Sequence, residues 1–281
     1  MFKISGKKQL TPLIYSLEVE APRIAKSAKP GQFLIVRPTE NGERVPLTIC
    51  DYDAEKGTVR IVVQIAGVSS SKICMMNEGD FLCDVAGPLG KPSEFMDIPY
   101  EELKNKRYLF VAGGVGAAPV YPQAMYLHKA GAHVDVIIGA RNKDLIIMED
   151  EMKKACTNLY ICTDDGSKGE KGVVTLLMER LGNNYDMCVA IGPMIMMKFA
   201  TLTAKKLNLP ITVSLNTLMV DGTGMCGACR VSVAGKTMFA CVDGPEFNGY
   251  DVDFDEAMRR QTLYRKQEQD ANEAAGLVLK R

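Results

Sequence analysis

Four residues toward the carboxyl-terminal end have the types and spacing of metal ligands. Asp221, Cys226, Cys229 and Cys241 follow the pattern D-x4-C-x2-C-x11-C. The plant-type [2Fe-2S] pattern is C-x4-C-x2-C with a distant fourth cysteine, so the chain matches it with aspartate in the first place. Three glycines in the loop permit the unusual backbone angles of a chain wrapped around inorganic sulfide, and they expose N–H groups toward negative charge. The spacing therefore predicts an iron-sulfur loop held by three thiolates and one carboxylate.

Two other interpretations of these cysteines stay open. Zinc accepts mixed thiolate and carboxylate ligands, although structural zinc sites favour cysteine with histidine, and both histidines of the chain, His128 and His133, are distant in sequence. Cysteines of an ordinary turn would hold no metal. The spacing favours the iron-sulfur interpretation over both.

A second glycine-rich segment follows an apolar run at residues 109–112. Gly113, Gly114 and Gly116 precede Pro119 in the pattern G-x-G-x-x-P, and a helix-like segment follows. Glycines at such a turn let the backbone approach a dinucleotide pyrophosphate, whose charge the helix amino terminus stabilises. The third glycine of the standard fingerprint is missing, so an ordinary strand-to-helix turn remains an alternative.

Three further strand ends strengthen the dinucleotide interpretation, because ligands of open parallel sheets bind outside the carboxyl ends of the strands. The residues at these ends are Gly139 and Arg141, Asp164 and Asp165, and Gly192, Pro193 and Met194. An aspartate there would accept a hydrogen bond from a ribose hydroxyl and repel a 2'-phosphate, which favours NAD. Arg141 would have the opposite effect and favour NADP. Each of these residues could instead serve ordinary turn geometry.

The elements that must position these residues fall into four segments. Residues 1–98 contain short β-branched runs, at 13–19, 32–37, 58–65 and 80–85, between turn dipeptides at 30–31, 41–42, 56–57 and 87–88, which predicts an all-β barrel or sandwich. Residues 99–210 alternate apolar strands with helical segments, as in an α/β domain with a parallel sheet. Residues 211–253 hold the cysteine loop. Residues 254–281 form a charged tail, either an exposed helix or a segment ordered by a partner.

Length and composition agree with this division and exclude several classes of protein. A chain of 281 residues with 47% apolar and 24% charged residues fits two ordinary globular domains. Lys and Arg total 34, as do Asp and Glu, so no broad positive field exists to bind nucleic acid. We find neither a signal peptide nor a run of about 18 apolar residues, and we expect a cytoplasmic protein without membrane attachment. The odd number of cysteines, nine, does not suggest a disulfide framework.

The order of the motifs resembles the ferredoxin-NADP reductase superfamily over essentially the whole chain. The motifs are R-V-P-L-T-I at 44–49, G-V-S-S at 67–70, the glycine turn and the ferredoxin-like cysteine loop. The chain is most similar to the branch that contains the electron-transfer subunit of dihydroorotate dehydrogenase and the small subunit of NADH-dependent ferredoxin:NADP oxidoreductase. Asp221 in place of a cysteine and the charged segment 254–281 favour the second of these relatives.

The resemblance implies that the β domain binds FAD, with FMN as an alternative. Arg44, Pro46, Leu47 and Thr48 would lie along the flavin and its phosphates. Val62, Val63 and Gln64 would lie on the neighbouring strand. Gly67, Ser69 and Ser70 would lie at the pyrophosphate. The superfamily usually has R-x-Y-[ST] in the first segment, so Pro46 stands where an aromatic residue would stack on the flavin. Arg44 has the forked geometry of a phosphate clamp.

The resemblance also implies an oxidoreductase function. Electrons would pass between NAD(H), FAD and the [2Fe-2S] cluster, in a heterodimer with a larger flavin subunit that carries [4Fe-4S] clusters and reacts with ferredoxin by electron bifurcation. Hydride transfer needs no protein acid or base, so no catalytic residue is predicted. Two alternatives remain. One is an electron-transfer subunit of a dihydroorotate dehydrogenase or glutamate synthase-like complex. The other is a non-catalytic nucleotide-binding module stabilised by a structural zinc ion.

Overall fold

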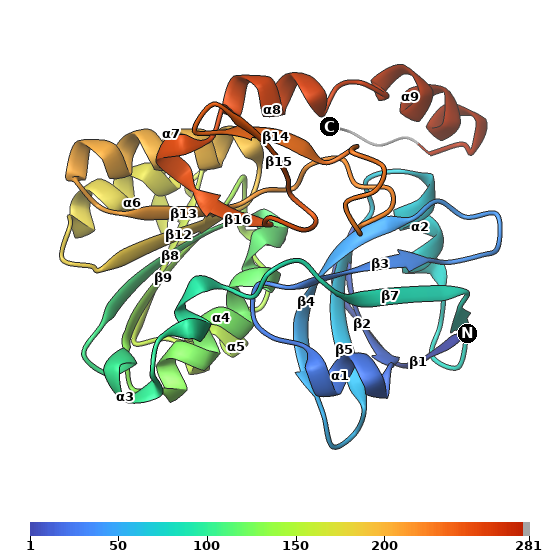
Figure 1. Ribbon diagram of the computed structural model, residues 1–281, viewed down its shortest axis with the longest axis horizontal. Helices are drawn as coiled ribbons and strands as arrows, with labels where there is room; N and C mark the ends of the chain where they lie inside the picture. The colour runs from blue at the N-terminus through green and yellow to red at the C-terminus, as the bar shows by residue number, and fades with distance from the viewer. Residues whose placement is uncertain (278–281) are drawn as a thin grey trace.

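The amino-terminal third of the computed structural model, which describes residues 1–277, is an antiparallel, nearly closed barrel sheet (Figure 1). Its strands in spatial order are β6 (Phe81–Leu82), β1 (Phe2–Thr11), β2 (Ile14–Glu20), β5 (Thr58–Gln64), β4 (Val45–Asp53), β3 (Phe33–Arg37) and β7 (Asp84–Leu89). Leu17, Leu34 and Ile61 fill its interior and are fully buried. Helix α1 (Pro22–Ser27) packs on β4, β5 and β7, and α2 (Val68–Met75) packs on β5. The predicted barrel is confirmed.

Two details of the barrel differ from the prediction. The run at 80–85 splits into β6 and β7, which pair with β1 and β3 respectively. The dipeptide Gly87-Pro88 lies inside β7 and not in a turn. A glycine is needed there because a Cβ atom at Gly87 would meet the Leu34 side chain at 2.5 Å. Glycine therefore marks a close approach of two strands at this position, a role that the sequence does not distinguish from a turn.

The second sheet is parallel except at one edge. Its strands in order are β11 (Glu170–Lys171), β10 (Asn158–Thr163), β9 (His133–Ala140), β8 (Arg107–Gly113), β12 (Met187–Ile191), β13 (Ile211–Ser214) and the antiparallel β16 (Glu246–Asn248). Phe110 of β8 packs on one face of the sheet, whereas Leu109 and Val111 pack on the other. Such two-sided burial is typical of parallel sheets. The predicted α/β architecture is confirmed.

Helices cover both faces of this sheet, so the region has three layers (Figure 1). On one face lie α4 (Ala117–Lys129) and α5 (Glu149–Ala155), and on the other α6 (Val174–Leu181) and α7 (Met194–Leu207). The short helix α3 (Tyr100–Leu103) precedes β8. None of the helices between residues 1 and 277 combines the length and hydropathy needed to cross a bilayer.

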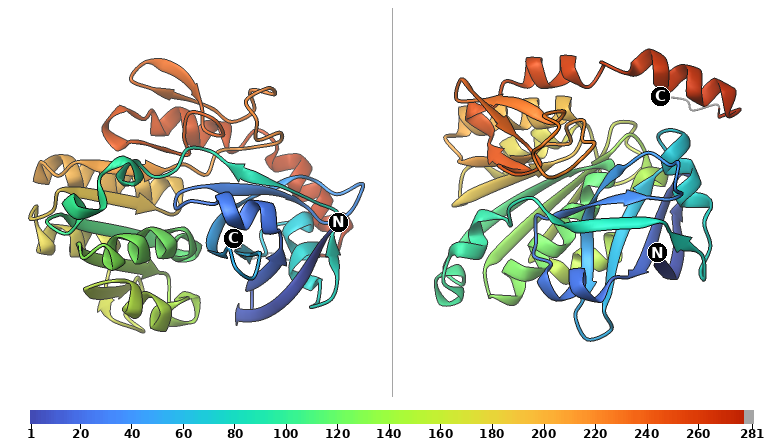
Figure 2. Two further views of the ribbon diagram at one scale, coloured as in Figure 1. Left: turned by 60° about the horizontal axis from the view of Figure 1, so that its bottom comes forward. Right: turned by 45° about the vertical axis from the view of Figure 1, so that its right-hand side comes forward.

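The remainder of the chain lies above the junction of the two sheets (Figures 1 and 2). The cysteine loop leads into a hairpin of β14 (Arg230–Val233) and β15 (Lys236–Phe239), and β16 is followed by α8 (Phe254–Arg260) and α9 (Arg265–Ala274). Helix α8 packs on α7 and buries Phe254 and Ala257, so one face of this part of the predicted tail is covered. Helix α9 is exposed except at Asn272. Residues 278–281 of the predicted tail lie outside the described residues.

Polar contacts join the two sheets. Arg60 of β5 pairs with Glu151 of α5 at 2.5 Å, and its guanidinium lies 5.2 Å from the ring centroid of Tyr121 on α4. On the other side of the junction, Glu246 of β16 accepts hydrogen bonds from Ser93 (3.0 Å) and from Gln123 of α4 (2.8 Å). Because charged hydrogen bonds shielded from water are stronger than those in solvent, the Arg60–Glu151 pair helps to hold the two sheets in a defined orientation.

Candidate functional site

The barrel is split at the position where the sequence places the flavin. Residues 45–48 of β4 pair with β3, but β4 joins β5 only from Ile49 onward. Residues 62–64 of β5 pair with β2 on their other side. Within residues 1–277, the facing edges of these two segments therefore lack a partner strand; we call this place the β4/β5 split. Unpaired strand edges offer backbone donors and acceptors to a ligand, and a flavin ring carries N–H and carbonyl groups along one edge, so the split fits a flavin.

Six of the predicted flavin residues form this split, but their side chains are placed differently. Those that remain accessible are Pro46, Leu47, Thr48 and Gln64. Val62 and Val63 are buried, with 7% and 1% of their surface exposed. Their side chains contribute to packing, and only their backbone could contact a ligand. The predicted flavin residues thus lie on the two strands that border the split, but the sequence did not separate side-chain from backbone positions.

The predicted pyrophosphate residues lie at the start of α2, directly after the split. Gly67 precedes the first turn of α2. The Ser70 hydroxyl accepts hydrogen bonds from the backbone N–H groups of Ala66 (2.9 Å) and Gly67 (3.0 Å). The Ser69 hydroxyl donates to Glu43. Ser70 thus organises the turn, while the Ser69 hydroxyl already has a carboxylate acceptor. The backbone N–H groups of the first helical turn and the smallness of Gly67 fit an anion at this end of α2.

Arg44 lies beside the split but contacts the cysteine loop. Its Nε donates to the carbonyl oxygen of Val220 at 3.0 Å, and one terminal nitrogen lies 3.5 Å from the carbonyl oxygen of Asp221. A second terminal nitrogen is 3.9 Å from the carboxylate of Asp84. The guanidinium therefore connects the predicted flavin strand to the predicted iron-sulfur loop.

The predicted dinucleotide turn is a strand, a 3-10 turn and a helix in succession. Strand β8 ends at Gly113, η2 covers Gly114–Gly116, and α4 begins at Ala117, with Pro119 buried inside α4. A Cβ atom at Gly116 would overlap the carbonyl oxygen of Ile191, and one at Gly113 would overlap the side chain of Met196. Gly114 has a φ of 55° and open space where a Cβ would point. Gly113 and Gly116 thus permit close packing, and Gly114 leaves the surface free for a ligand.

The other predicted nucleotide residues lie along the same edge of the sheet. Strands β9, β10 and β12 run parallel to β8, so Gly139, Asp164 and Gly192 end up at one carboxyl-terminal edge. Arg141, Asp164 and Asp165 are exposed, as is Pro193, whereas Met194 is 3% exposed and belongs to the core. The Ser167 hydroxyl donates to Asp165 and lowers the pKa of that carboxyl below its usual value. Residues of η2 contact β5, so this edge faces the β4/β5 split.

The cysteine loop brings two of its four predicted ligands into contact and holds the other two nearby. The Sγ atoms of Cys229 and Cys241 are 3.2 Å apart, and both side chains are buried. Cys226 is exposed, and it lies near enough to Asp221 for the carboxylate charge to act on its thiol. Within residues 1–277, no three such side chains converge as they would around a single ion. A cluster of two irons takes two protein ligands on each iron and spreads its ligands more widely than a single ion, so these three thiols and one carboxylate fit a [2Fe-2S] group.

Backbone donors of the loop point at these ligands. The N–H groups of Ala228, Asp221 and Val220 lower the pKa of the Cys226 thiol, with Ala228 the largest contributor. Burial raises the pKa of Cys241 to about 12, while the N–H of Gly224 opposes that rise. The Thr223 hydroxyl and backbone N–H (2.9 Å) donate to Asp221 and lower the pKa of its carboxyl. The loop therefore presents donors to concentrated negative charge, as a thiolate-ligated cluster needs.

Three residues near these sites were missed by the sequence analysis. Arg260 of α8 donates to the carbonyl oxygen of Ala228 in the cysteine loop at 3.2 Å. Asn272 of α9 has its Oδ1 3.6 Å from where a Cβ at Gly67 would lie. Glu246 is a buried carboxyl at the junction, and burial raises its pKa to about 7. None of the three belongs to a motif, and the burial of Asn272 and Glu246 depends on segments distant in sequence, so no local pattern could have identified them.

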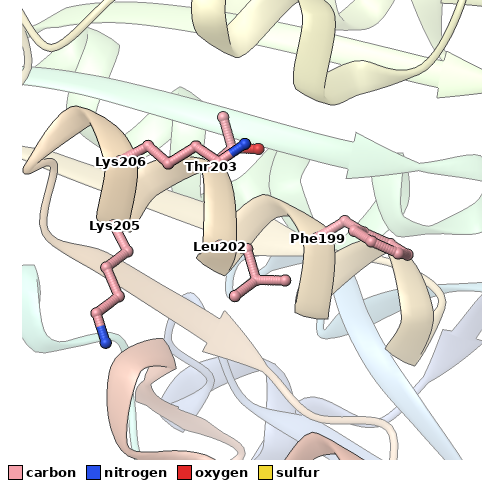
Figure 3. A pocket seen from close by; sticks show the side chains of 5 residues that line it. All are labelled: Phe199, Leu202, Thr203, Lys205 and Lys206. Atoms are coloured by element: carbon pink, nitrogen blue, oxygen red, sulfur yellow. The ribbon is translucent and has the colours of Figure 1, made fainter.

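A hollow of about 410 Å³ on the outer face of α7 lies apart from these sites. It is lined by Phe199, Leu202, Thr203, Lys205 and Lys206, all from one helix (Figure 3). No predicted site residue lines it, so it contributes nothing to the site described above.

A split antiparallel barrel, an adjoining parallel sheet with a glycine turn, and a ferredoxin-like loop define an iron-sulfur flavoprotein reductase. The fold agrees with that of a cytochrome P450 reductase from Amycolatopsis, with a TM-score of 0.61 over 74% of this chain and 66% of that one, at 14% identity. Such a low identity supports the fold alone.

Closer comparisons define the family. Residues 216–253 match the iron-sulfur cluster binding domain of dihydroorotate dehydrogenase B. A Thermotoga maritima protein named as a homologue of the electron transfer subunit of dihydroorotate dehydrogenase B (NAD(+)) is 47% identical over 95% of this chain and 92% of its own length. The Geobacillus kaustophilus electron transfer subunit of that enzyme is 30% identical over 89% of this chain and 96% of its own length. The chain belongs to the family of dihydroorotate dehydrogenase B electron-transfer subunits and their homologues.

One solved structure with a similar sequence identity concerns flavin-based electron bifurcation. A chain from the structure of an NADH-dependent reduced ferredoxin-NADP oxidoreductase matches with a TM-score of 0.89 and 45% identity, over 98% of this chain and 97% of that one. Together, these comparisons confirm the predicted oxidoreductase class, its electron-transfer function and its flavin, iron-sulfur and nicotinamide cofactors.

Proposed function

We propose that the chain is the small electron-transfer subunit of an electron-bifurcating NADH-dependent ferredoxin:NADP oxidoreductase. The observation that carries the proposal is the adjacency of the three sites: η2 of the nucleotide edge contacts β5 at the split, and Arg44 beside the split contacts the cysteine loop. The high similarity to the chain from the ferredoxin-NADP oxidoreductase structure supports the particular complex. A cytoplasmic location remains a prediction.

Each part of the chain has a proposed role in this scheme. Bound nicotinamide, flavin and iron-sulfur groups would supply hydride exchange and one-electron exchange. The backbone edges of the β4/β5 split would orient the flavin ring, and the start of α2 would bind its pyrophosphate. Gly114 and the aspartates after β10 would bind the dinucleotide. We further propose that residues 1–98, 99–210, 211–253 and 254–281 act as the flavin, nucleotide, cluster and tail segments.

The cofactors are tested by measuring iron, zinc and flavin in protein purified without oxygen, followed by titration with NADH. We expect FAD, two irons per chain and loss of visible absorbance on reduction. Cys241→Ser should lose iron, whereas Cys83→Ser, the same change at a half-buried cysteine outside the loop, should retain it. A colourless protein with one zinc would overturn the proposal in favour of a zinc-stapled nucleotide-binding module.

A larger partner subunit that carries flavin and [4Fe-4S] clusters and reacts with ferredoxin is also part of the proposal. Exposed apolar side chains border the cysteine loop: Met225 is 86% exposed, Val220 48% and Val242 39%. Apolar groups gathered around a redox site support a protein contact there. Met225→Asp should weaken co-purification of a large subunit, whereas Met75→Asp, at a 69% exposed residue of α2, should not. Recovery of a dihydroorotate dehydrogenase or glutamate synthase-like subunit instead would assign the chain to one of those complexes.

A further inference from the structure

Two arginines hold backbone carbonyl groups of the cysteine loop from different sides. Arg44, next to β4, reaches the carbonyl oxygens of Val220 (3.0 Å) and Asp221 (3.5 Å). Arg260, the last residue of α8, donates to the carbonyl oxygen of Ala228 at 3.2 Å. The contacted carbonyls lie at both ends of the segment that carries the first three predicted ligands. The arginines are 176 and 32 residues away from their acceptors in sequence, so the loop is fixed by elements outside it.

The hydrogen bonds of Arg44 determine which way a peptide group of the loop faces. A trans peptide is planar, so its C=O and N–H groups point in opposite directions. When Arg44 holds the Val220 carbonyl on the outside, the N–H of Asp221, which belongs to the same peptide unit, points inward. That N–H is one of the donors to the Cys226 thiol. By the same geometry, the bond from Arg260 to Ala228 turns the N–H of Cys229 away from α8.

Arginine suits this role chemically. Its guanidinium carries several donors in a rigid plane and stays charged at all accessible pH values, so it can hold carbonyl groups without titrating. Three thiolates, one carboxylate and two sulfides make the predicted site anionic, and reduction adds a further electron. Nearby positive charge and hydrogen bonds to the ligand loop stabilise the reduced form more than the oxidised form.

We propose that Arg44 and Arg260 are positioning residues for the iron-sulfur loop, which fix its peptide orientations from the barrel and from α8 and raise the reduction potential of the cluster. The inference rests on the proposed function in one respect, that the loop binds a [2Fe-2S] cluster. It assigns part of the carboxyl-terminal extension, α8, to the cluster site. It also assigns Arg44 a role besides the flavin contact that the resemblance implies.

Adjacent arginines on α8 provide a matched test. Arg259 and Arg260 carry the same charge, but Arg259 is exposed and Arg260 reaches the loop. We would purify the wild type, Arg260→Gln and Arg259→Gln without oxygen, and measure iron and FAD per chain, the EPR spectrum of the reduced cluster and its midpoint potential. Arg260→Gln should shift the potential to more negative values and alter the EPR line shape, with FAD content unchanged. Arg259→Gln should match the wild type.

A third variant separates charge from geometry. Arg260→Lys keeps the positive charge but loses the planar fork, so it should recover most of the potential and leave the EPR line shape altered. Equal shifts in Arg259→Gln and Arg260→Gln would show that only long-range charge acts, and they would overturn the positioning role. An Arg260→Gln protein that is indistinguishable from the wild type would also overturn it.

Arg44→Gln tests the other side of the loop. Because Arg44 contacts two carbonyls, we expect a larger change in the EPR spectrum than for Arg260→Gln, with iron content at or below that of the wild type. Loss of FAD with an unchanged cluster signal would restrict Arg44 to flavin binding and overturn this part of the inference. If the wild type itself holds no iron, the proposed function fails; if it holds the cluster and both glutamine variants match it, only the positioning role fails.

Discussion

The nucleotide edge and the cysteine loop are both rich in glycine, but glycine serves a different physical purpose in each. At the edge, Gly116 has an ordinary helical φ of -59°, and it is required because a Cβ atom would overlap the backbone of Ile191. In the loop, the φ angles of Gly222, Gly224 and Gly227 are 85°, 87° and 65°, in the left-handed region. Gly116 thus supplies space between two strand ends, whereas the three loop glycines supply backbone freedom.

This difference predicts different sensitivities to the same substitution. A side chain that collides with backbone forces whole strands to move, whereas a strained φ costs about 1–2 kcal/mol per residue and can be borne locally. The loss of stability on alanine substitution at glycines of the two regions therefore tests this difference directly.

The largest loss of stability is expected for Gly116→Ala. The added methyl group would overlap the carbonyl of Ile191, so η2 and the end of β12 would have to separate. Overpacking of this kind costs about 3 kcal/mol or more when backbone cannot yield. Urea unfolding followed by circular dichroism measures the loss. A loss below about 1 kcal/mol would show that the two turns are loosely packed.

Gly222→Ala should be the next most damaging change. Besides the left-handed φ of 85°, its Cβ atom would lie 2.8 Å from side-chain atoms of both Ile35 and Leu89. Flexible side chains yield more easily than backbone, so we expect a loss of about 2 kcal/mol, together with reduced iron content. Gly235→Ala, with a φ of 72° and open space around it, is the control for strain alone. Equal losses in the two variants would show that contact with the barrel contributes nothing.

Glu246 of β16, a carboxyl buried beside Ser93 and Gln123, predicts a pH effect of intermediate size. Burial raises its pKa from 4.5 to about 7, against the hydrogen bonds from Ser93 and Gln123. The folded protein therefore holds this proton more tightly than the unfolded chain, so the resulting stability is complete below pH 4.5 and is lost as the pH rises to about 7. Glu246→Gln keeps a neutral side chain at every pH.

The thermal midpoint of Glu246→Gln should consequently fall less than that of the wild type as the pH rises through this window. Glu94→Gln, at the exposed neighbouring carboxylate, is the control. Parallel curves for the wild type and Glu246→Gln would contradict the tight binding of the proton.

The smallest loss of stability is expected for Gly114→Ala. Its φ of 55° makes alanine strained by about 1 kcal/mol, but no atom lies within 4 Å of the added methyl group. The open space is where we propose that the dinucleotide binds, so the affinity for NADH should fall more than the stability does. Titration with NADH, followed by flavin absorbance, tests this expectation. Unchanged affinity would remove Gly114 from the nucleotide site.

Local patterns of burial were sufficient to predict much of the architecture. The alternating run of β2, the apolar run of β8 and the glycine turn before α4 all lie where the sequence indicates. Strand β1 was missed because it is rich in lysine and lies beside β6, which pairs with it at only two positions, so much of it faces solvent. The periodicity of apolar residues reflects burial, so it does not predict a strand that is only partly buried.

The sequence by itself determined that a β barrel is followed by an α/β sheet and a cysteine loop, the types of the four predicted cluster ligands and the family of the chain, because these follow from residue type and spacing. Tertiary structure alone decided that β4 pairs with β5 only from Ile49 onward, that Cys229 lies against Cys241, and that Arg44 and Arg260 reach the loop. These features depend on where strand ladders end and on which distant side chains meet a given carbonyl group. Such contacts arise only when the whole chain packs, so no local pattern encodes them.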